Sequence, residues 1–130
     1  MSEHSEQVAI FQWAELQKGA MPELALLFAI PNGAKLPWRR NKRGKRYSPE
    51  ATRLKAEGLK SGVPDICLPV PRAGWHGLFI ELKVGKNKPT TEQETWLDRL
   101  FEQGYCAVVC YGSDDAINFI TRYLEATIEH

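Results

Sequence analysis

The stretch that decides the fold is Gly62-Val63-Pro64-Asp65, followed by Leu78-Phe79-Ile80-Glu81-Leu82-Lys83. In the second segment, the apolar residues Leu78, Ile80 and Leu82 alternate with Phe79, Glu81 and Lys83. This alternation predicts a strand with one buried apolar face. Residues 65–68 can pair with it as an antiparallel strand through a turn at 71–74, where proline and glycine favour chain reversal. We therefore expect a β-hairpin in the sheet.

The expected pairing of this hairpin places two carboxylates side by side. A register that matches Leu68 with Leu78 sets Asp65 directly opposite Glu81. Opposed side chains on one face of a sheet have Cβ atoms roughly 5 Å apart. Two like charges that close repel each other unless a cation lies between them. The sequence therefore predicts a site for a divalent metal ion.

The residue types at this site favour phosphate chemistry. Carboxylate oxygens suit Mg²⁺ or Mn²⁺ far better than zinc, and such an ion can polarise a phosphate oxygen and activate a bound water. Lys83 follows Glu81 on the same face, where its ammonium can steady the attacking water or the charge that develops on phosphate. The alternative is a surface cluster at a sheet edge, because Glu-x-Lys is common by chance.

Two polar residues fall on helix faces that should be apolar. Gln93 lies three residues before Trp96 and should point with it toward the core, although a capping box with Thr90 explains it equally well. Glu3 lies on the apolar stripe that contains Ile10. A glutamate there is costly without a neighbouring metal. The alternative is a frayed first turn in which Glu3 complements the helix dipole.

A strongly basic segment, 33–60, contrasts with an otherwise acidic chain. It has ten Lys or Arg against two Glu, a balance of +8, whereas the rest of the chain totals −7. This segment favours binding to phosphates, and Trp38 or Tyr47 can stack on an exposed base. The alternative is a solvated loop, and solubility explains Lys86 equally well. The expected DNA contacts are Asn32, Lys35, Arg39, Arg40, Lys42, Arg43, Lys45, Arg46 and Lys86.

The remaining pattern predicts one three-layer mixed α/β domain over residues 1–130. Helices are expected at 2–17, from Ser48 to near Gly58 or Gly62, at 90–103 and at 113–125. A buried strand is expected at 24–30, a strand covered on both faces at 105–111, and a loop at 35–47.

The composition favours a cytoplasmic protein without a membrane partner. No apolar run approaches the roughly 20 residues of a membrane span. Cys67, Cys106 and Cys110 lie in apolar segments, which suits buried thiols in a reducing compartment. No nucleotide-binding loop is present in the sequence.

Several of these features, in this order, resemble the VRR-NUC family of the PD-(D/E)XK nuclease superfamily, in its small stand-alone bacteriophage and bacterial form. The resemblance covers nearly the whole chain. It rests on Gly62-Val63-Pro64-Asp65, Ile80-Glu81-Leu82-Lys83 and Gln93, with support from Glu3, Gln7, Asn32-Gly33 and Gly104-Tyr105. One departure is that Val84-Gly85-Lys86 follows Lys83 where the family name leads one to expect arginines.

The resemblance implies a PD-(D/E)XK fold with a mixed central sheet between helices. It implies that Asp65, Glu81 and the backbone carbonyl of Leu82 bind Mg²⁺ or Mn²⁺, and that Lys83 assists the water. It also implies an acid from the first helix, Glu3 or its neighbour Glu6, and support from Gln93. The catalytic residues that the resemblance implies are therefore Glu3, Asp65, Glu81, Lys83 and Gln93.

The implied activity is metal-dependent endonucleolytic cleavage of branched DNA, either a Holliday junction or a flap, in a bacterial or phage-infected cytoplasm. A homodimer is expected from the same resemblance, since resolution of a junction needs paired incisions. The alternative is a non-catalytic DNA-binding module on a degenerate nuclease fold, for which the basic segment alone suffices. A third hypothesis is a sequence-specific endonuclease of the restriction type.

Overall fold

A four-stranded mixed sheet forms the centre of the computed structural model, which describes residues 2–33 and 36–128. The strands lie in the order β1-β4-β5-β6. Neighbours among β1, β4 and β5 are antiparallel, and β6 pairs with β5 in parallel. The bounds are Phe28–Ala29 for β1, Ile66–Leu68 for β4, Leu78–Lys83 for β5 and Cys106–Tyr111 for β6. β4 and β5 are thus the two central strands.

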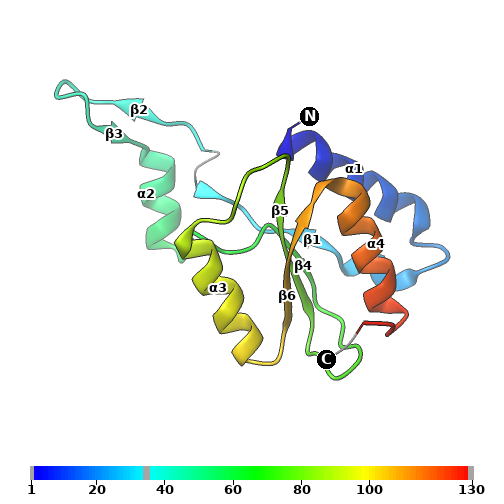
Figure 1. Cartoon of the computed structure of the whole chain (residues 1–130). Coiled ribbons are helices and arrows are strands. Elements are labelled where there is room, and N and C mark those ends of the chain that lie inside the picture. The colour runs from blue at the N-terminus through cyan, green and yellow to red at the C-terminus, as the bar shows by residue number, and fades with distance from the viewer. Residues whose placement is uncertain (1, 34–35, 129–130) are drawn as a thin grey trace.

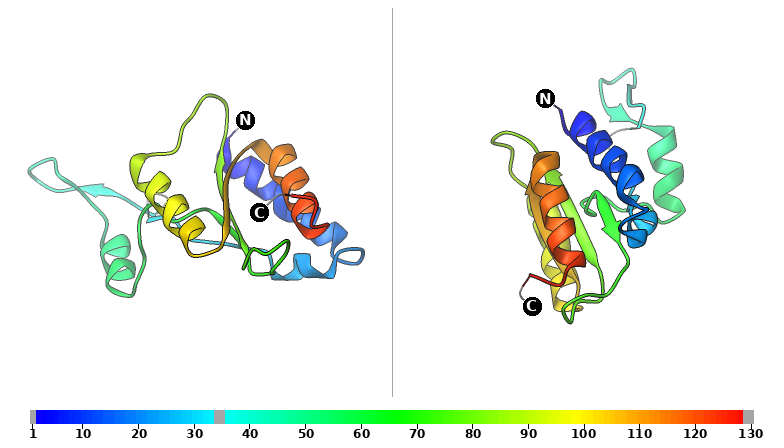
Figure 2. Two further views of the ribbon diagram at one scale, coloured as in Figure 1. Left: turned by 60° about the horizontal axis from the view of Figure 1, so that its bottom comes forward. Right: turned by 90° about the vertical axis from the view of Figure 1, so that its right-hand side faces the viewer.

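Helices cover both faces of this sheet (Figure 1). α1 and α4 pack against each other on one face, and α3 lies on the other (Figures 1 and 2). The bounds are Glu3–Gln17 for α1, Thr91–Glu102 for α3 and Gly112–Leu124 for α4. The predicted fold, a mixed sheet between two helical layers, is confirmed.

The predicted register of the central hairpin is also confirmed. Leu68 pairs with Leu78 and Ile66 pairs with Ile80. The chain reverses at residues 72–75, where Ala73 and Gly74 both have positive φ, 49° and 87°. The same register continues to Asp65, just before β4, and sets it against Glu81.

The hydrophobic core lies between the sheet and the α1–α4 layer. Every second residue of β5 enters it, as the alternating pattern predicts. Tyr123 of α4 is fully buried, and its hydroxyl donates to the carbonyl of Val70 at 2.7 Å. The three cysteines are free and buried, and burial raises the pKa of Cys110 to about 12, so its thiol stays protonated. The largest fully buried apolar residues of the core include Ile10, Ile66, Leu68, Leu78, Ile80, Leu82, Ile120 and Tyr123.

The basic stretch folds as a hairpin, so the prediction of a loop at 35–47 was wrong. β2 (Arg39–Arg40) pairs antiparallel with β3 (Arg46–Tyr47) to form a separate two-stranded sheet. We call residues 39–47 the basic hairpin. α2 (Pro49–Ala56) follows it and begins as predicted, since the Ser48 side chain accepts from the Ala51 amide. The pattern failed here because the hairpin buries no apolar face.

Two other strand predictions need correction. Residues 24–30 do not form a buried strand, because a 3-10 helix occupies Pro22–Leu26 and β1 has only two residues, both exposed. Pro22 favours the helical turn at that point. The segment 105–111 does form β6, but as an edge strand it is incompletely covered, with Tyr111 exposed.

Within the described residues, no helix has both the length and the apolar character needed to span a bilayer.

Candidate functional site

Asp65 is held firmly at the end of the central hairpin. Its backbone carbonyl accepts from the Ile30 amide at 2.8 Å, and its carboxylate Oδ2 accepts from the Leu82 amide at 2.7 Å. The side chain is only 6% exposed. A buried carboxylate that accepts a backbone N–H is fixed in orientation. Asp65 is therefore anchored to both neighbouring strands, with its carboxylate directed at β5.

The loop before Asp65 is docked on the first turns of α3. The indole of Trp96 donates to the Ser61 carbonyl at 3.0 Å, and the Ser61 hydroxyl hydrogen bonds to Glu92. Gly62 has φ of +84°, and a Cβ there would meet the Glu92 backbone at 3.1 Å. Glycine is thus required for both its conformation and the close approach of α3. Sequence reasoning missed these supporting residues, and only the glycine gave a signal.

Glu81 is a buried acid with an unsatisfied oxygen. It is 1% exposed, and its Oε1 has no hydrogen-bond partner among the described residues. The pKa of Glu81 is raised from 4.5 to about 8, chiefly by burial and also by the adjacent Asp65 carboxyl, while Lys83 opposes the shift. Leaving such a group unpaired costs about 1–3 kcal/mol or more. The pocket therefore favours a positive charge beside these two acids.

Lys83 supplies part of that charge. Its Nζ lies 3.7 Å from Glu81 Oε2, and the residue is 8% exposed. An ammonium at this distance in a desolvated pocket interacts strongly with the carboxylate. It leaves Glu81 Oε1 unsatisfied, however, so the ion pair alone does not complete the site.

The donor set fits a divalent ion with oxygen ligands. Asp65 and Glu81 face each other, and one carboxylate oxygen is unpartnered. Mg²⁺ and Mn²⁺ accept two carboxylates together with carbonyl or water oxygens. No group of three or more His, Cys, Asp or Glu suited to a metal occurs within residues 2–33 and 36–128. The backbone carbonyl of Leu82, the third ligand expected from the sequence, is an oxygen of the kind that these ions accept.

The first helix contributes two acids with different surroundings. Glu6 Oε1 accepts from the Ser113 amide at 3.0 Å and so caps the start of α4. Glu3 is half-buried, and its charge helps to raise the pKa of Glu81. The start of α1 lies beside the loop that follows β5 in each view (Figures 1 and 2). Of the two acids, Glu3 is therefore the one whose charge acts on Glu81.

Gln93 forms the predicted capping box. The Gln93 side-chain Oε1 accepts from the backbone N–H of Thr90 at 2.9 Å, and the backbone N–H of Gln93 donates to Thr90 Oγ1 at 3.1 Å. Among the described residues, its side chain makes no hydrogen bond to Asp65, Glu81 or Lys83. Gln93 thus fixes the start of α3, the helix on which the Asp65 loop is docked.

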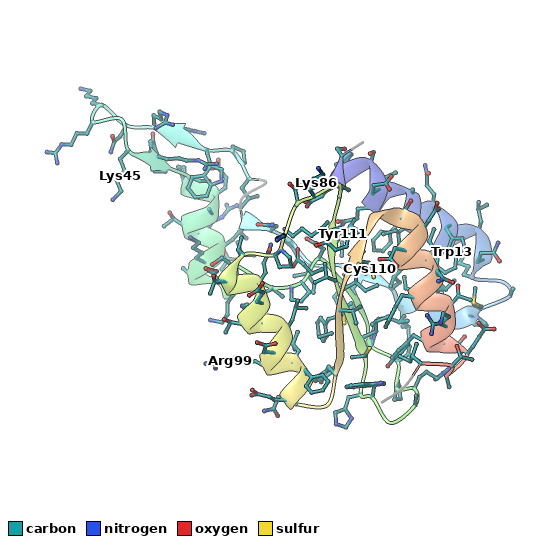
Figure 3. All side chains as sticks on the ribbon, in the orientation of Figure 1. Trp13, Lys45, Lys86, Arg99, Cys110 and Tyr111 are labelled. Atoms are coloured by element: carbon teal, nitrogen blue, oxygen red, sulfur yellow. The ribbon has the colours of Figure 1, made fainter. Side chains whose placement is uncertain are left out.

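The expected DNA contacts fall into two places. Lys86 is exposed in the loop after β5, whereas Lys45 lies on the basic hairpin, away from the sheet (Figure 3). Asn32 is half-buried at the start of the connection to the hairpin. Lys35 lies outside the described residues. The structure therefore does not gather these residues into one surface, and five further cations lie on the hairpin with Lys45: Arg39, Arg40, Lys42, Arg43 and Arg46.

Comparison with known proteins agrees with this arrangement. The VRR-NUC domain family model matches residues 1–114. The chain belongs to the VRR-NUC family. A solved structure described as a VRR_NUC domain protein is similar, with 27% identity and a TM-score of 0.75 over 97% of this chain and 90% of that chain. A search of curated proteins gives no match.

Membership places the chain among nucleases, whose usual polymer is DNA and which generally depend on a divalent metal. The matched residues include the whole central hairpin, α1 and α3. The predicted family is therefore confirmed over the part of the chain that carries the acidic pair.

Proposed function

We propose that the protein is a Mg²⁺- or Mn²⁺-dependent endonuclease that hydrolyses phosphodiester bonds in branched DNA, a Holliday junction or a flap. The observation that carries the proposal is the buried pair Asp65 and Glu81, opposed across β4 and β5 with one carboxylate oxygen unsatisfied. Two buried carboxylates this close are costly to hold ionised unless a cation lies beside them. Family membership supports the nuclease class.

The residues divide the work between holding an ion and handling the nucleophile. Asp65, Glu81 and the carbonyl of Leu82 would hold the metal, which when bound supplies Lewis-acid polarisation of phosphate and a more acidic water. Asp65 is positioned for this by the Leu82 amide, which fixes its carboxylate. Because the pair is anchored by backbone hydrogen bonds, little reorganisation is needed when substrate arrives.

Lys83 is proposed to orient the water and to stabilise developing negative charge. Its ammonium already lies in the pocket, 3.7 Å from Glu81. A positive group that is desolvated before the reaction stabilises the transition state more than a hydrated one. Glu3 adds a further negative charge beside Glu81, and Gln93 supports the site through α3.

The proposed DNA contacts follow from charge and position. Lys86 lies in the loop just beyond Lys83, where it can contact a phosphate near the cleaved bond. The cations of the basic hairpin would contact DNA further away. Asn32 and Lys35 remain proposed DNA contacts, and Lys35 lies outside the described residues. A substrate that touches both places must extend across the molecule, which suits branched DNA. Junction resolution would use two copies of the chain, since it requires paired incisions.

A cleavage panel tests the proposal. Labelled four-way junction, flap and linear duplex are incubated with Mg²⁺, Mn²⁺ or EDTA. We expect cleavage of a branched substrate with either metal and none with EDTA. Asp65→Asn should reduce the rate at least about a thousandfold, while DNA binding survives.

The other outcomes assign the alternatives. Absence of cleavage on every substrate with either metal would favour the DNA-binding module. Cutting of linear duplex at a defined sequence, with no preference for branches, would favour the restriction-type enzyme.

A further inference from the structure

The basic hairpin is a projecting arm. β2 and β3 pair only with each other, Arg39 with Tyr47 and Arg40 with Arg46. With α2 they stand away from the three-layered body (Figures 1 and 2). Among the described residues between Gly33 and Lys60, none belongs to the core cluster around the sheet, although Ala51 of α2 is itself buried. Local interactions therefore determine the shape of the arm, and its role is not to complete the core cluster.

The turn of the arm is highly organised. The side-chain oxygen of Asn41 accepts from the amides of Arg43 and Lys45, both at 2.9 Å. Gly44 has φ of +78°, and its carbonyl accepts from the Arg40 guanidinium at 2.9 Å. Asn and Gly are the residues that favour such a turn. Residues 41–45 consequently form a defined tip.

The base of the arm is fixed by two other cations. The guanidinium of Arg46 lies 4.7 Å from the centre of the Trp38 ring, and the Trp38 indole donates to the Gly33 carbonyl. Arg39 forms an ion pair with Glu50 of α2 at 3.6 Å. Together with Arg40 at the turn, these arginines have internal partners. These arginines therefore stabilise the two-stranded ribbon as well as adding positive charge to it.

The three cations at the tip are different. Lys42, Arg43 and Lys45 are exposed, and their side chains make no hydrogen bond or ion pair within the described residues. Three like charges on a rigid turn repel one another. The tip sequence Asn41-Lys42-Arg43-Gly44-Lys45 has no aromatic residue on which a base could stack. Its chemistry matches phosphate rather than base.

We propose that Lys42, Arg43 and Lys45 bind the phosphates of a double-stranded DNA segment remote from the bond that is cleaved. The inference rests on the proposed function for the identity of the polymer. A two-stranded ribbon fits the major groove, which is about 12 Å wide. Single-stranded DNA, in contrast, is bound mainly by aromatic stacking, which the tip lacks. Affinity should therefore depend on the length of the duplex.

The test measures DNA binding without cleavage, by fluorescence anisotropy in the Asp65→Asn background. The tip variant carries Lys42→Gln, Arg43→Gln and Lys45→Gln. Duplexes extend from about 10 to about 30 base pairs, one to three helical turns. We expect the tip variant to lose roughly tenfold to a hundredfold in affinity for the longest duplex and nothing for the shortest. The slope of the logarithm of the association constant against the logarithm of salt concentration should become shallower by about 2 to 3 in the tip variant.

A matched control removes the same charge elsewhere. Lys18→Gln, Arg99→Gln and Arg122→Gln replace three exposed cations, one at the C-terminal cap of α1 and one each on α3 and α4. This control should bind long duplex nearly as the parent does. A charge-preserving variant with Lys42→Arg, Arg43→Lys and Lys45→Arg should retain binding, because phosphate contact needs charge rather than one side-chain shape.

The proposal fails if the tip variant binds long duplex as well as the parent, or if the control loses as much. An equal loss on single-stranded DNA of the same length would overturn the preference for duplex. Loss in the charge-preserving variant would indicate base reading instead of phosphate contact. These binding outcomes can be told apart from failure of the proposed function, which is tested by cleavage with the unmodified protein.

Discussion

The acidic pair and the basic hairpin handle charge in opposite ways. Asp65 and Glu81 are buried beside each other in the central hairpin, and their proximity raises the pKa of Glu81. The cations of the hairpin tip are exposed, fixed only by their own turn, and surrounded by water. Burial strengthens electrostatic interactions, whereas exposure permits reach to a distant phosphate. Under the two proposals, the buried pair would carry out cleavage and the exposed tip would bind the polymer at a distance.

Among the variants that compare the two regions, removal of the buried cation Lys83 gives the largest expected effect. Lys83→Ala should reduce the cleavage rate by about a hundredfold to a thousandfold, because it removes a charge preorganised in the pocket. DNA affinity should stay within about twofold, since Lys83 is almost inaccessible. Single-turnover cleavage and anisotropy measure the two quantities. Lys18→Ala, at an exposed cation, serves as control; full activity of Lys83→Ala would break the division between the two regions.

Neutralising Glu81 should change how stability depends on pH without metal. Its pKa is raised from 4.5 to about 8, so the folded state binds the extra proton between these values and becomes less stable as pH rises. Glu81→Gln removes this penalty and should be more stable than the unmodified protein by about 2 to 5 kcal/mol near pH 9. The gain should vanish below about pH 4, where the acid is protonated in both states.

Thermal unfolding in EDTA across this pH range measures the effect. Addition of Mn²⁺ should then stabilise the unmodified protein and leave Glu81→Gln nearly unchanged. A pH-independent difference between the two proteins would contradict the unsatisfied, desolvated state of Glu81.

A pair of glycine substitutions gives the smallest expected effects. Gly62→Ala forces positive φ on alanine and places Cβ against the Glu92 backbone, which should cost about 2 to 3 kcal/mol. Gly44→Ala has similar φ, but no atom lies within 4 Å of the added Cβ. Because no residue of the basic hairpin belongs to the core cluster, the melting temperature of the Gly44→Ala variant should fall by no more than about 2 °C. Equal losses in the two variants would show that the arm is part of the cooperative core.

The central hairpin could be predicted because its signals are local and strong. Alternation in β5 and the proline and glycine at the turn fixed which face each side chain occupies, and that placed Asp65 opposite Glu81. The three-layer fold followed from the order of elements. The capping box of Gln93 was also visible from spacing with Thr90.

Other features depend on contacts that no local pattern reveals. Glu6 caps α4 through Ser113, more than a hundred residues away in sequence, so Glu3 and Glu6 could not be separated beforehand. The basic hairpin is built from polar contacts of Asn41 and Arg46, which leave no hydrophobic periodicity. The apolar segment 24–30 misled because burial of Leu24 and Leu27 occurs in a helical turn and its exit, outside a strand.

The most direct measurement is anomalous diffraction from a crystal soaked in Mn²⁺. The account predicts a peak in contact with the carboxylates of Asp65 and Glu81 and the carbonyl of Leu82. A pocket without a peak, with Glu81 still paired only to Lys83, would contradict it.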